Sequence, residues 1–130
     1  MAFTRRVPSL NLVLLPLTGA GRTACDVITS ACLQWEVPHL MAPAGVVVTE
    51  FVRESVLRAS TMMDLHIVLG RRYLLVQLFD GGQRASEMSP LSAVLIEELV
   101  ARWGYLRQEG RTVTWAALRL TGPPCPAPRR

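Results

Sequence analysis

The stretch Val46–Ser60, VVVTEFVRESVLRAS, constrains the fold most, because its apolar residues recur every three or four positions. The residues on this repeat are Val48, Phe51, Val52, Ser55, Val56 and Ala59. A period of about 3.6 residues puts them on one side of a helix. We therefore predict a central helix with that side in the core. Charged residues lie near its edge, namely Glu50, Arg53, Glu54 and Arg58.

The pattern changes from helical to alternating after Ser60, where Leu65, Ile67 and Leu69 occupy every second position. A turn and an apolar return segment then predict an antiparallel hairpin. The other predicted elements are a strand at Ser9–Leu15, a helix from Thr18 or Gly19 to about Trp35, the hairpin's return strand Tyr73–Phe79, a helix from Ser89-Pro90 to Trp103 that Gly104 ends, and a second hairpin of Tyr105–Gln108 and Thr112–Leu120.

Two hairpins separated by a helix do not fit a parallel, doubly wound sheet. We predict an α+β fold, a two-layer sandwich in which a mixed, mainly antiparallel sheet carries three helices on one face. The chain of 130 residues fits a single domain, predicted at 9–121. It is flanked by an N-terminal arm at 1–8 and a disordered tail rich in proline and arginine at 122–130.

The positive charge of the chain is concentrated at its ends. Arg5, Arg6, Arg129 and Arg130 account for the formal excess of +4, so the predicted domain is balanced. With no basic stripe interleaved with aromatic residues, we predict no nucleic-acid partner. The sequence has no lysine, which excludes a Walker-type phosphate loop, the phosphate-binding lysine of protein kinases and Schiff-base chemistry.

The cysteines and histidines predict neither a zinc site nor disulfides. No CxxC or HExxH spacing is present, and His39 and His66 are isolated. Cys25 and Cys32 lie seven residues apart on a predicted helix, about 10 Å along its axis, which is too far for a disulfide. Unpaired thiols favour a reducing compartment, so we predict a cytoplasmic protein.

A different hypothesis treats Arg5 and Arg6 with the apolar Leu10–Leu17 as a twin-arginine or secretory leader of a small exported domain. Pro8 and Pro16 interrupt the apolar part, and no clean cleavage site follows. No segment reaches the roughly 18 apolar residues that a membrane span needs, so we predict no membrane partner.

Glu50 and Glu54 are one helical turn apart, which leaves two interpretations open. The two carboxylates could jointly face a metal ion or an activated water. They could also belong to a solvated ladder of ion pairs, Glu50 with Arg53 and Glu54 with Arg58, each contributing roughly 0.2–0.5 kcal/mol.

Three local patterns and the order of elements resemble the ATPase domain shared by gyrase, bacterial histidine kinases and, most closely, the anti-sigma-factor serine kinases. Thr49–Val56 occupies the place of the family's first nucleotide motif, a glutamate followed four residues later by asparagine. Phe79-Asp80-Gly81-Gly82 resembles the second motif, whose aspartate contacts the adenine amino group. Leu95–Gly104 with Gly110–Ala116 resembles the family's last helix and closing hairpin.

The resemblance implies specific roles for residues at the nucleotide site. Glu50 matches the general-base glutamate, and Glu54 stands where the family has its magnesium-binding asparagine. Asp80 and Gly82 match the adenine end, while Arg84 replaces the next motif glycine and is a candidate phosphate contact. The glycine-rich lid before the last helix is missing, and its bare backbone amides are what bring phosphates close.

The replacement at Glu54 opposes phosphate binding. A carboxylate about 6 Å from one phosphate charge costs roughly 3 kcal/mol at an effective dielectric near 20, which is about a hundredfold in affinity. Magnesium could instead use Glu54 as an oxygen ligand. The resemblance therefore implies a regulatory domain with weak or lost binding of ATP and magnesium. Its partner would be a sigma factor or an anti-sigma antagonist, and a homodimer is an expectation too. The alternative is an active ATP-dependent serine/threonine kinase with an unusual lid.

Overall fold

The computed structural model describes residues 7–82 and 88–121. Arg84 and most of the two predicted flanking segments lie outside these residues. The described elements are β1 (Ser9–Leu14), α1 (Ala20–Gln34), the 3₁₀ turn η1 (Pro38–Leu40), α2 (Met41–Arg58), β2 (Met63–Leu69), β3 (Tyr73–Asp80), α3 (Pro90–Leu99), β4 (Arg102–Gln108) and β5 (Arg111–Arg119).

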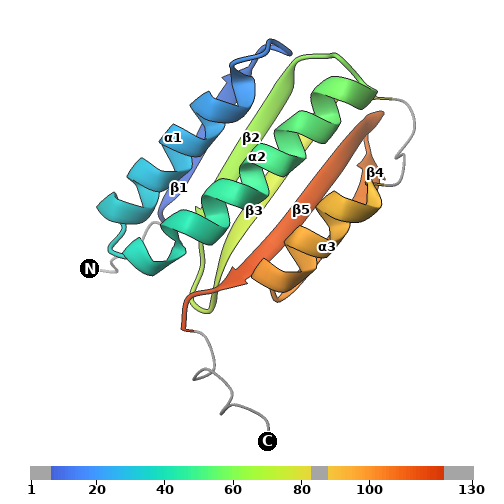
Figure 1. Cartoon of the computed structure of the whole chain (residues 1–130). Helices are drawn as coiled ribbons and strands as arrows, with labels where there is room; N and C mark the ends of the chain where they lie inside the picture. Colours follow the sequence, from blue (N-terminus) through green and yellow to red (C-terminus); the bar gives the residue numbers. More distant parts are fainter. Residues whose placement is uncertain (1–6, 83–87, 122–130) are drawn as a thin grey trace, which may run out of the picture.

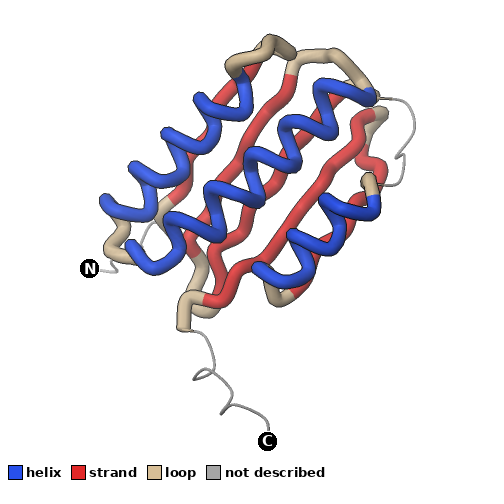
Figure 2. Tube along the Cα trace, viewed as in Figure 1, coloured by secondary structure: helices blue, strands red, loops and turns tan. Residues whose placement is uncertain are grey.

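The five strands form one sheet in the order β1-β2-β3-β5-β4, with the three helices side by side on one face (Figure 1). The predicted α+β two-layer sandwich is therefore confirmed. Every pair of neighbouring strands is antiparallel, so the sheet is not mixed as predicted. β5 lies between β3 and β4, which places the last strand inside the sheet (Figure 2).

The predicted apolar side of the central helix does face the sheet. Val48, Phe51, Val52 and Ser55 of α2 are all buried. They pack with alternate residues of the strands, such as Leu65 in β2, in a single hydrophobic core. Burying a side chain the size of Phe51 contributes about 1.5–3 kcal/mol to the stability of the fold. The buried side of α2 therefore stabilises the packing of the helical layer on the sheet.

The helix α2 begins five residues before the predicted stretch, at Met41. Pro38 starts η1, which leads directly into α2, and Pro43 lies in the first turn of α2, where the missing backbone N–H leaves no hydrogen bond unmade. Cys25 and Cys32 lie on α1 as free thiols, and burial raises the pKa of Cys32.

The last helix is shorter than predicted. α3 ends at Leu99, and Val100 is already extended. Trp103, predicted as the final helical residue, belongs to β4 and packs against the core from that strand. Gly104 is consequently not a helix terminator. A side chain there would lie 3.2 Å from the indole of Trp115, so the glycine lets that ring lie against β4.

Within residues 7–82 and 88–121, the helices are too short or too polar to cross a lipid bilayer. The segment at the centre of the leader hypothesis contains β1, which pairs along its whole length with β2. Leu69 also donates a backbone hydrogen bond to the carbonyl of Pro8 at 2.9 Å.

Candidate functional site

Asp80 lies at the end of β3 and points toward α2, where its carboxylate is completely buried. Its Oδ2 accepts a hydrogen bond from the hydroxyl of Ser55 at 2.7 Å and another from the guanidinium of Arg58. Its Oδ1 accepts from the backbone N–H of Gly82 at 2.8 Å. Both oxygens of the predicted adenine contact are therefore already bonded within the chain.

Gly82 is needed for the turn that brings its amide to Asp80. A Cβ at this position would lie 2.9 Å from Oδ1 of Asp80 and 3.1 Å from the side chain of Ala59, closer than such contacts allow. Gly82 therefore supports the conformation of the aspartate, and its carbonyl accepts a hydrogen bond from Thr112 at 3.0 Å.

The predicted ion pair between Glu54 and Arg58 is wrong. The expected partner was Glu54, one turn back on α2, but Arg58 pairs with Asp80 across the interface between helix and sheet. Its side chain is only 16% exposed, and its buried Nε has no hydrogen-bond partner among the described residues. The guanidinium of Arg58 therefore neutralises the charge of Asp80 within the chain.

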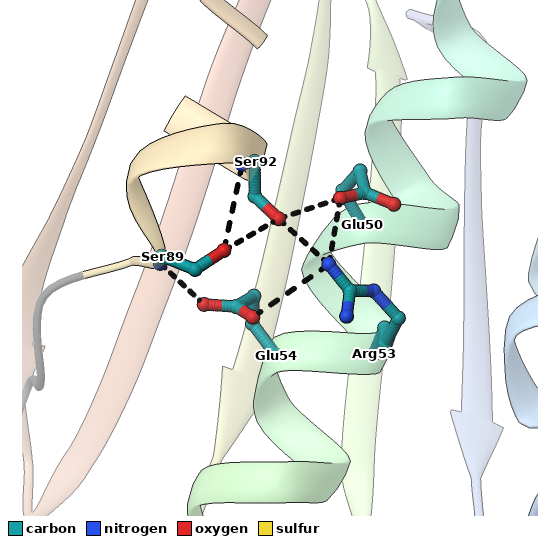
Figure 3. A network of polar contacts seen from close by, with 5 residues as sticks. All are labelled: Glu50, Arg53, Glu54, Ser89 and Ser92. Atoms are coloured by element: carbon teal, nitrogen blue, oxygen red, sulfur yellow. Dashed lines mark hydrogen bonds and ion pairs between the residues drawn. The ribbon is translucent and has the colours of Figure 1, made fainter. Parts of the chain in front are cut away.

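Glu50 contacts both its own helix and the first turn of α3 (Figure 3). Its Oε1 accepts from the hydroxyl of Ser92 at 2.6 Å and from Arg53 at 3.1 Å, which confirms the predicted pair with Arg53. Burial by itself raises the pKa of Glu50, but the hydrogen bonds from Ser92 and Arg53 and the charge of Arg53 outweigh it and lower that pKa. The same contact raises the pKa of Arg53.

Glu54 contacts the residue that caps α3 (Figure 3). Its Oε1 accepts from the backbone N–H of Ser89 at 2.8 Å, and its Oε2 lies 4.0 Å from Arg53. Ser89 is the N-cap of α3, as predicted, and its hydroxyl accepts from the N–H of Ser92. The two acids of α2 thus hold the first turn of α3 against α2.

Neither the metal interpretation nor the phosphate contact at Arg84 is tested by these contacts. In the described part of the chain, no group of three or more histidine, cysteine, aspartate or glutamate residues is close enough to hold a metal ion. Glu54 would therefore hold a magnesium ion with at most one further residue of these types, together with water or phosphate oxygens.

Sequence reasoning did not identify the residues that bond to the carboxylates of Asp80, Glu50 and Glu54 across elements. These residues are Ser55, Arg58, Ser89 and Ser92. Ser92 is fully buried although three neighbours on α3 are exposed, namely Leu91, Val94 and Leu95. A polar residue inside and apolar residues outside is the reverse of an ordinary surface helix. The sequence carries no signal of this inversion, because Leu91, Val94 and Leu95 have the spacing of a buried helix side.

Comparison with known proteins was informative only at the level of structure. No protein-family model and no curated protein matches this sequence. Eleven chains of solved structures do match. One is the crystal structure of the RsbU and RsbW domains of Rv1364c from Mycobacterium tuberculosis, with a TM-score of 0.69 and 19% identity. The match covers 89% of this chain and 33% of that one.

The fold is that of the histidine kinase-like ATPases. At this identity the likeness concerns the architecture, and the chain spans about a third of the length of the matched structure. Within the histidine kinase-like ATPase fold, α2 and the end of β3 face each other across the core, which brings Glu50, Glu54 and Asp80 to one side of the molecule.

Proposed function

We propose that this chain is a regulatory domain that acts by binding another protein and has weakened or lost the ability to bind ATP. The proposal combines the histidine kinase-like ATPase fold with an anti-sigma-factor role, in which the partner is a sigma factor or an anti-sigma antagonist. One observation carries it: the carboxylates that would meet a nucleotide are engaged by the chain's own donors.

At the adenine end, a nucleotide would have to displace Arg58 from Asp80. The exchange is unfavourable because a carboxylate accepts a weaker hydrogen bond from a neutral amino group than from a guanidinium. The displaced charge of Arg58 would also lose its partner in a place where its side chain is only 16% exposed. Arg58 thus supports the loss of adenine binding even though Asp80 and Gly82 are both retained.

At the phosphate end, Glu50 and Glu54 place two carboxylates beside the first turn of α3. The N-terminus of a helix attracts anions, and here Glu54 already satisfies the amide of Ser89. Phosphates approaching this turn would meet carboxylates in place of free amides. These contacts support a domain whose first turn of α3 is held in place without a nucleotide.

An active serine/threonine kinase is the second candidate, because the motif residues Glu50 and Asp80 are both retained. Glu50 is ionised at neutral pH, as a general base must be, although its lowered pKa makes it a weaker base than an ordinary glutamate. The two candidates differ in one measurable property, the affinity for ATP with magnesium.

The deciding experiment is a calorimetric titration of the full chain with ATP, with and without magnesium, followed by thermal unfolding at millimolar ATP. We expect no saturable heat and no rise in Tm. A ligand present at a hundred times its Kd would stabilise the chain by about 2.7 kcal/mol, so binding in the micromolar range would be obvious.

Micromolar binding together with transfer of phosphate to a serine of an antagonist protein would establish the kinase and refute our proposal. A matched variant, Arg58→Ala, tests the reason for the loss, because it frees one side of Asp80. If the variant gains ATP-dependent stabilisation that the parent lacks, Arg58 is the residue that closes the adenine end.

A further inference from the structure

The sheet has one face that no helix covers among the described residues (Figures 1 and 2). Residues directly opposite each other in neighbouring antiparallel strands share a face. Because Leu65 and Leu78 face the helices, the adjacent row faces outward. This outward row consists of Asn11, His66, Gln77, Trp115 and Gly104.

Apolar and aromatic side chains lie on this outer face beside the polar Asn11, His66 and Gln77 of that row. Trp115 lies against Gly104 and is partly exposed. Val68 and Leu75, which pair with each other in the next row, are also partly exposed, and Val13 on β1 is 57% exposed. The helices of a two-layer sandwich cover one face of the sheet, so these apolar side chains on the other face stay uncovered among the described residues.

The margin of the outer face is basic. Arg102, Arg111 and Arg119 point outward from β4 and β5, and Arg71 and Arg72 are exposed in the turn between β2 and β3. Asp64 is the one acidic residue in the outward rows of the described strands. It pairs with Arg111 at 2.7 Å, and that guanidinium lies 4.7 Å from the ring centre of Phe79.

The acids gather in the other layer. Seven lie on the helical side, namely Asp26, Glu36, Glu50, Glu54, Asp80, Glu97 and Glu98, against the arginines Arg22, Arg53, Arg58 and Arg107. The net charge of the domain is therefore balanced because the negative charge of the helical side cancels the positive charge of the outer face of the sheet. A partner with negative charge is attracted to the sheet and repelled from the helices.

We propose that the outer face of the sheet is the docking surface for an acidic amphipathic helix of the partner protein. The apolar side of that helix packs on Trp115 and Leu75, and its carboxylates pair with Arg102 and Arg119. Apolar residues around a tryptophan, with arginines at the rim, are typical of a protein–protein interface. This inference rests on the proposed function, because it assigns the partner's chemistry and its place of contact.

Two other occupants fit the face less well. A single-stranded nucleic acid needs neighbouring exposed aromatic rings on which successive bases stack, but Phe79 is buried beneath Arg111, and Gln77 lies between His66 and Trp115 in the central row. A second copy of this chain, docked sheet to sheet, would bring two sets of outward arginines together with one aspartate on each side, and like charges repel.

The test uses the full chain and a fluorescein-labelled peptide that forms about five helical turns, with leucine along one side and glutamate elsewhere. Fluorescence anisotropy should give a Kd on the order of 10 µM. The double variant Arg102→Glu, Arg119→Glu should weaken binding about tenfold, since two attractions at the rim become repulsions. Both arginines are exposed, and thermal unfolding verifies that the variant folds.

The matched control is Arg22→Glu, an equal change of charge on an exposed residue of α1, which should leave the affinity unchanged. A peptide with lysine in place of glutamate should not bind. The proposal is wrong if both peptides bind equally, if neither binds, or if the control weakens binding as much as the double variant.

Two further results would assign the face to another occupant and refute the proposal. One is tight binding of oligothymidylate that the same double variant abolishes, and the other is self-association that it abolishes. The ATP titration probes the opposite side of the sheet, at Asp80 and Glu50. Failure of the peptide test therefore leaves the loss of ATP binding standing, and detection of ATP binding leaves the peptide result interpretable.

Discussion

The two ends of the candidate site differ in how their carboxylates are held. Asp80 is completely buried and accepts from three donors that come from α2 and from the turn after β3. Glu50 and Glu54 are 15% and 14% exposed and connect α2 to a short helix. The adenine end is thus part of the core, whereas the phosphate end is a joint between two elements.

This difference supports two separate reasons for the proposed loss of ATP binding, one at each end of the candidate site. At Asp80 an internal arginine occupies the partner's place, and at Glu50 and Glu54 a neighbouring helix does. Removing the first contact should destabilise the whole domain, and removing the second should loosen α3. The following predictions test that contrast.

The largest effect is expected from Asp80→Asn. The side chain keeps its shape but loses its charge, which leaves Arg58 half-buried without a counterion, and we expect a loss of about 3 kcal/mol in the free energy of unfolding. Urea denaturation measures it. Asp64→Asn is the matched control on the exposed pair with Arg111, and it should lose less than about 1 kcal/mol. Equal losses would mean that the pair with Arg58 carries no special weight.

A smaller, pH-dependent effect is expected from Glu50→Gln, about 1–2 kcal/mol at neutral pH. Because the folded pKa of Glu50 is lowered, its stabilisation is complete above the unfolded value near 4.3 and is lost as the pH falls through the folded pKa. The parent and the variant should therefore converge in stability only in acid, below the folded pKa of Glu50. A difference that persists unchanged into acid would contradict the assignment of the carboxylate contact.

A loss of about 1 kcal/mol is expected from Glu54→Asn, because the side chain of asparagine is one methylene shorter and neutral, which weakens or breaks the hydrogen bond from Ser89. The change restores the asparagine of the family motif, yet we expect no ATP binding by calorimetry, since Arg58 and Ser92 still occupy both ends. Saturable binding by this single variant would show that the charge of Glu54 alone was responsible for the loss.

The smallest effect, about 0.5 kcal/mol, is expected from Gly104→Ala, far from both ends of the site. The added methyl group would meet the indole of Trp115 at 3.2 Å, and this ring can shift because it lies on the open face. Thermal unfolding and a change in tryptophan emission measure it. A loss as large as that of Asp80→Asn would show that the outer face is packed as rigidly as the core.

The layers and helices could be predicted because hydrophobic period is a local property. Val48, Phe51 and Val52 indicated the buried side of α2 without knowledge of its partners. The end of α3 could not be predicted in the same way, because Trp103 continues the helical spacing and yet satisfies the core equally well from β4. The order of the strands is likewise set by pairing between distant segments.

The site was predicted in part. The sequence placed Glu50, Glu54 and Asp80 together through the family resemblance, and it anticipated the pair of Glu50 with Arg53. It missed the pair of Arg58 with Asp80, because a spacing of four residues along a helix favours Glu54 and says nothing of a strand 22 residues away. Arg84 lies outside the described residues, so its role stays a prediction.

The position of β5 between β3 and β4 has a consequence for how the molecule is made. The strand that lies between β3 and β4 is made last, as Arg111–Arg119. A nascent chain emerging from the ribosome must therefore hold β3 with one open edge while α3 and β4 are synthesised. Exposed edges of this kind attract other chains. A chaperone that shields β3 during translation would raise the yield of native protein, and premature termination before β5 would leave an aggregation-prone fragment.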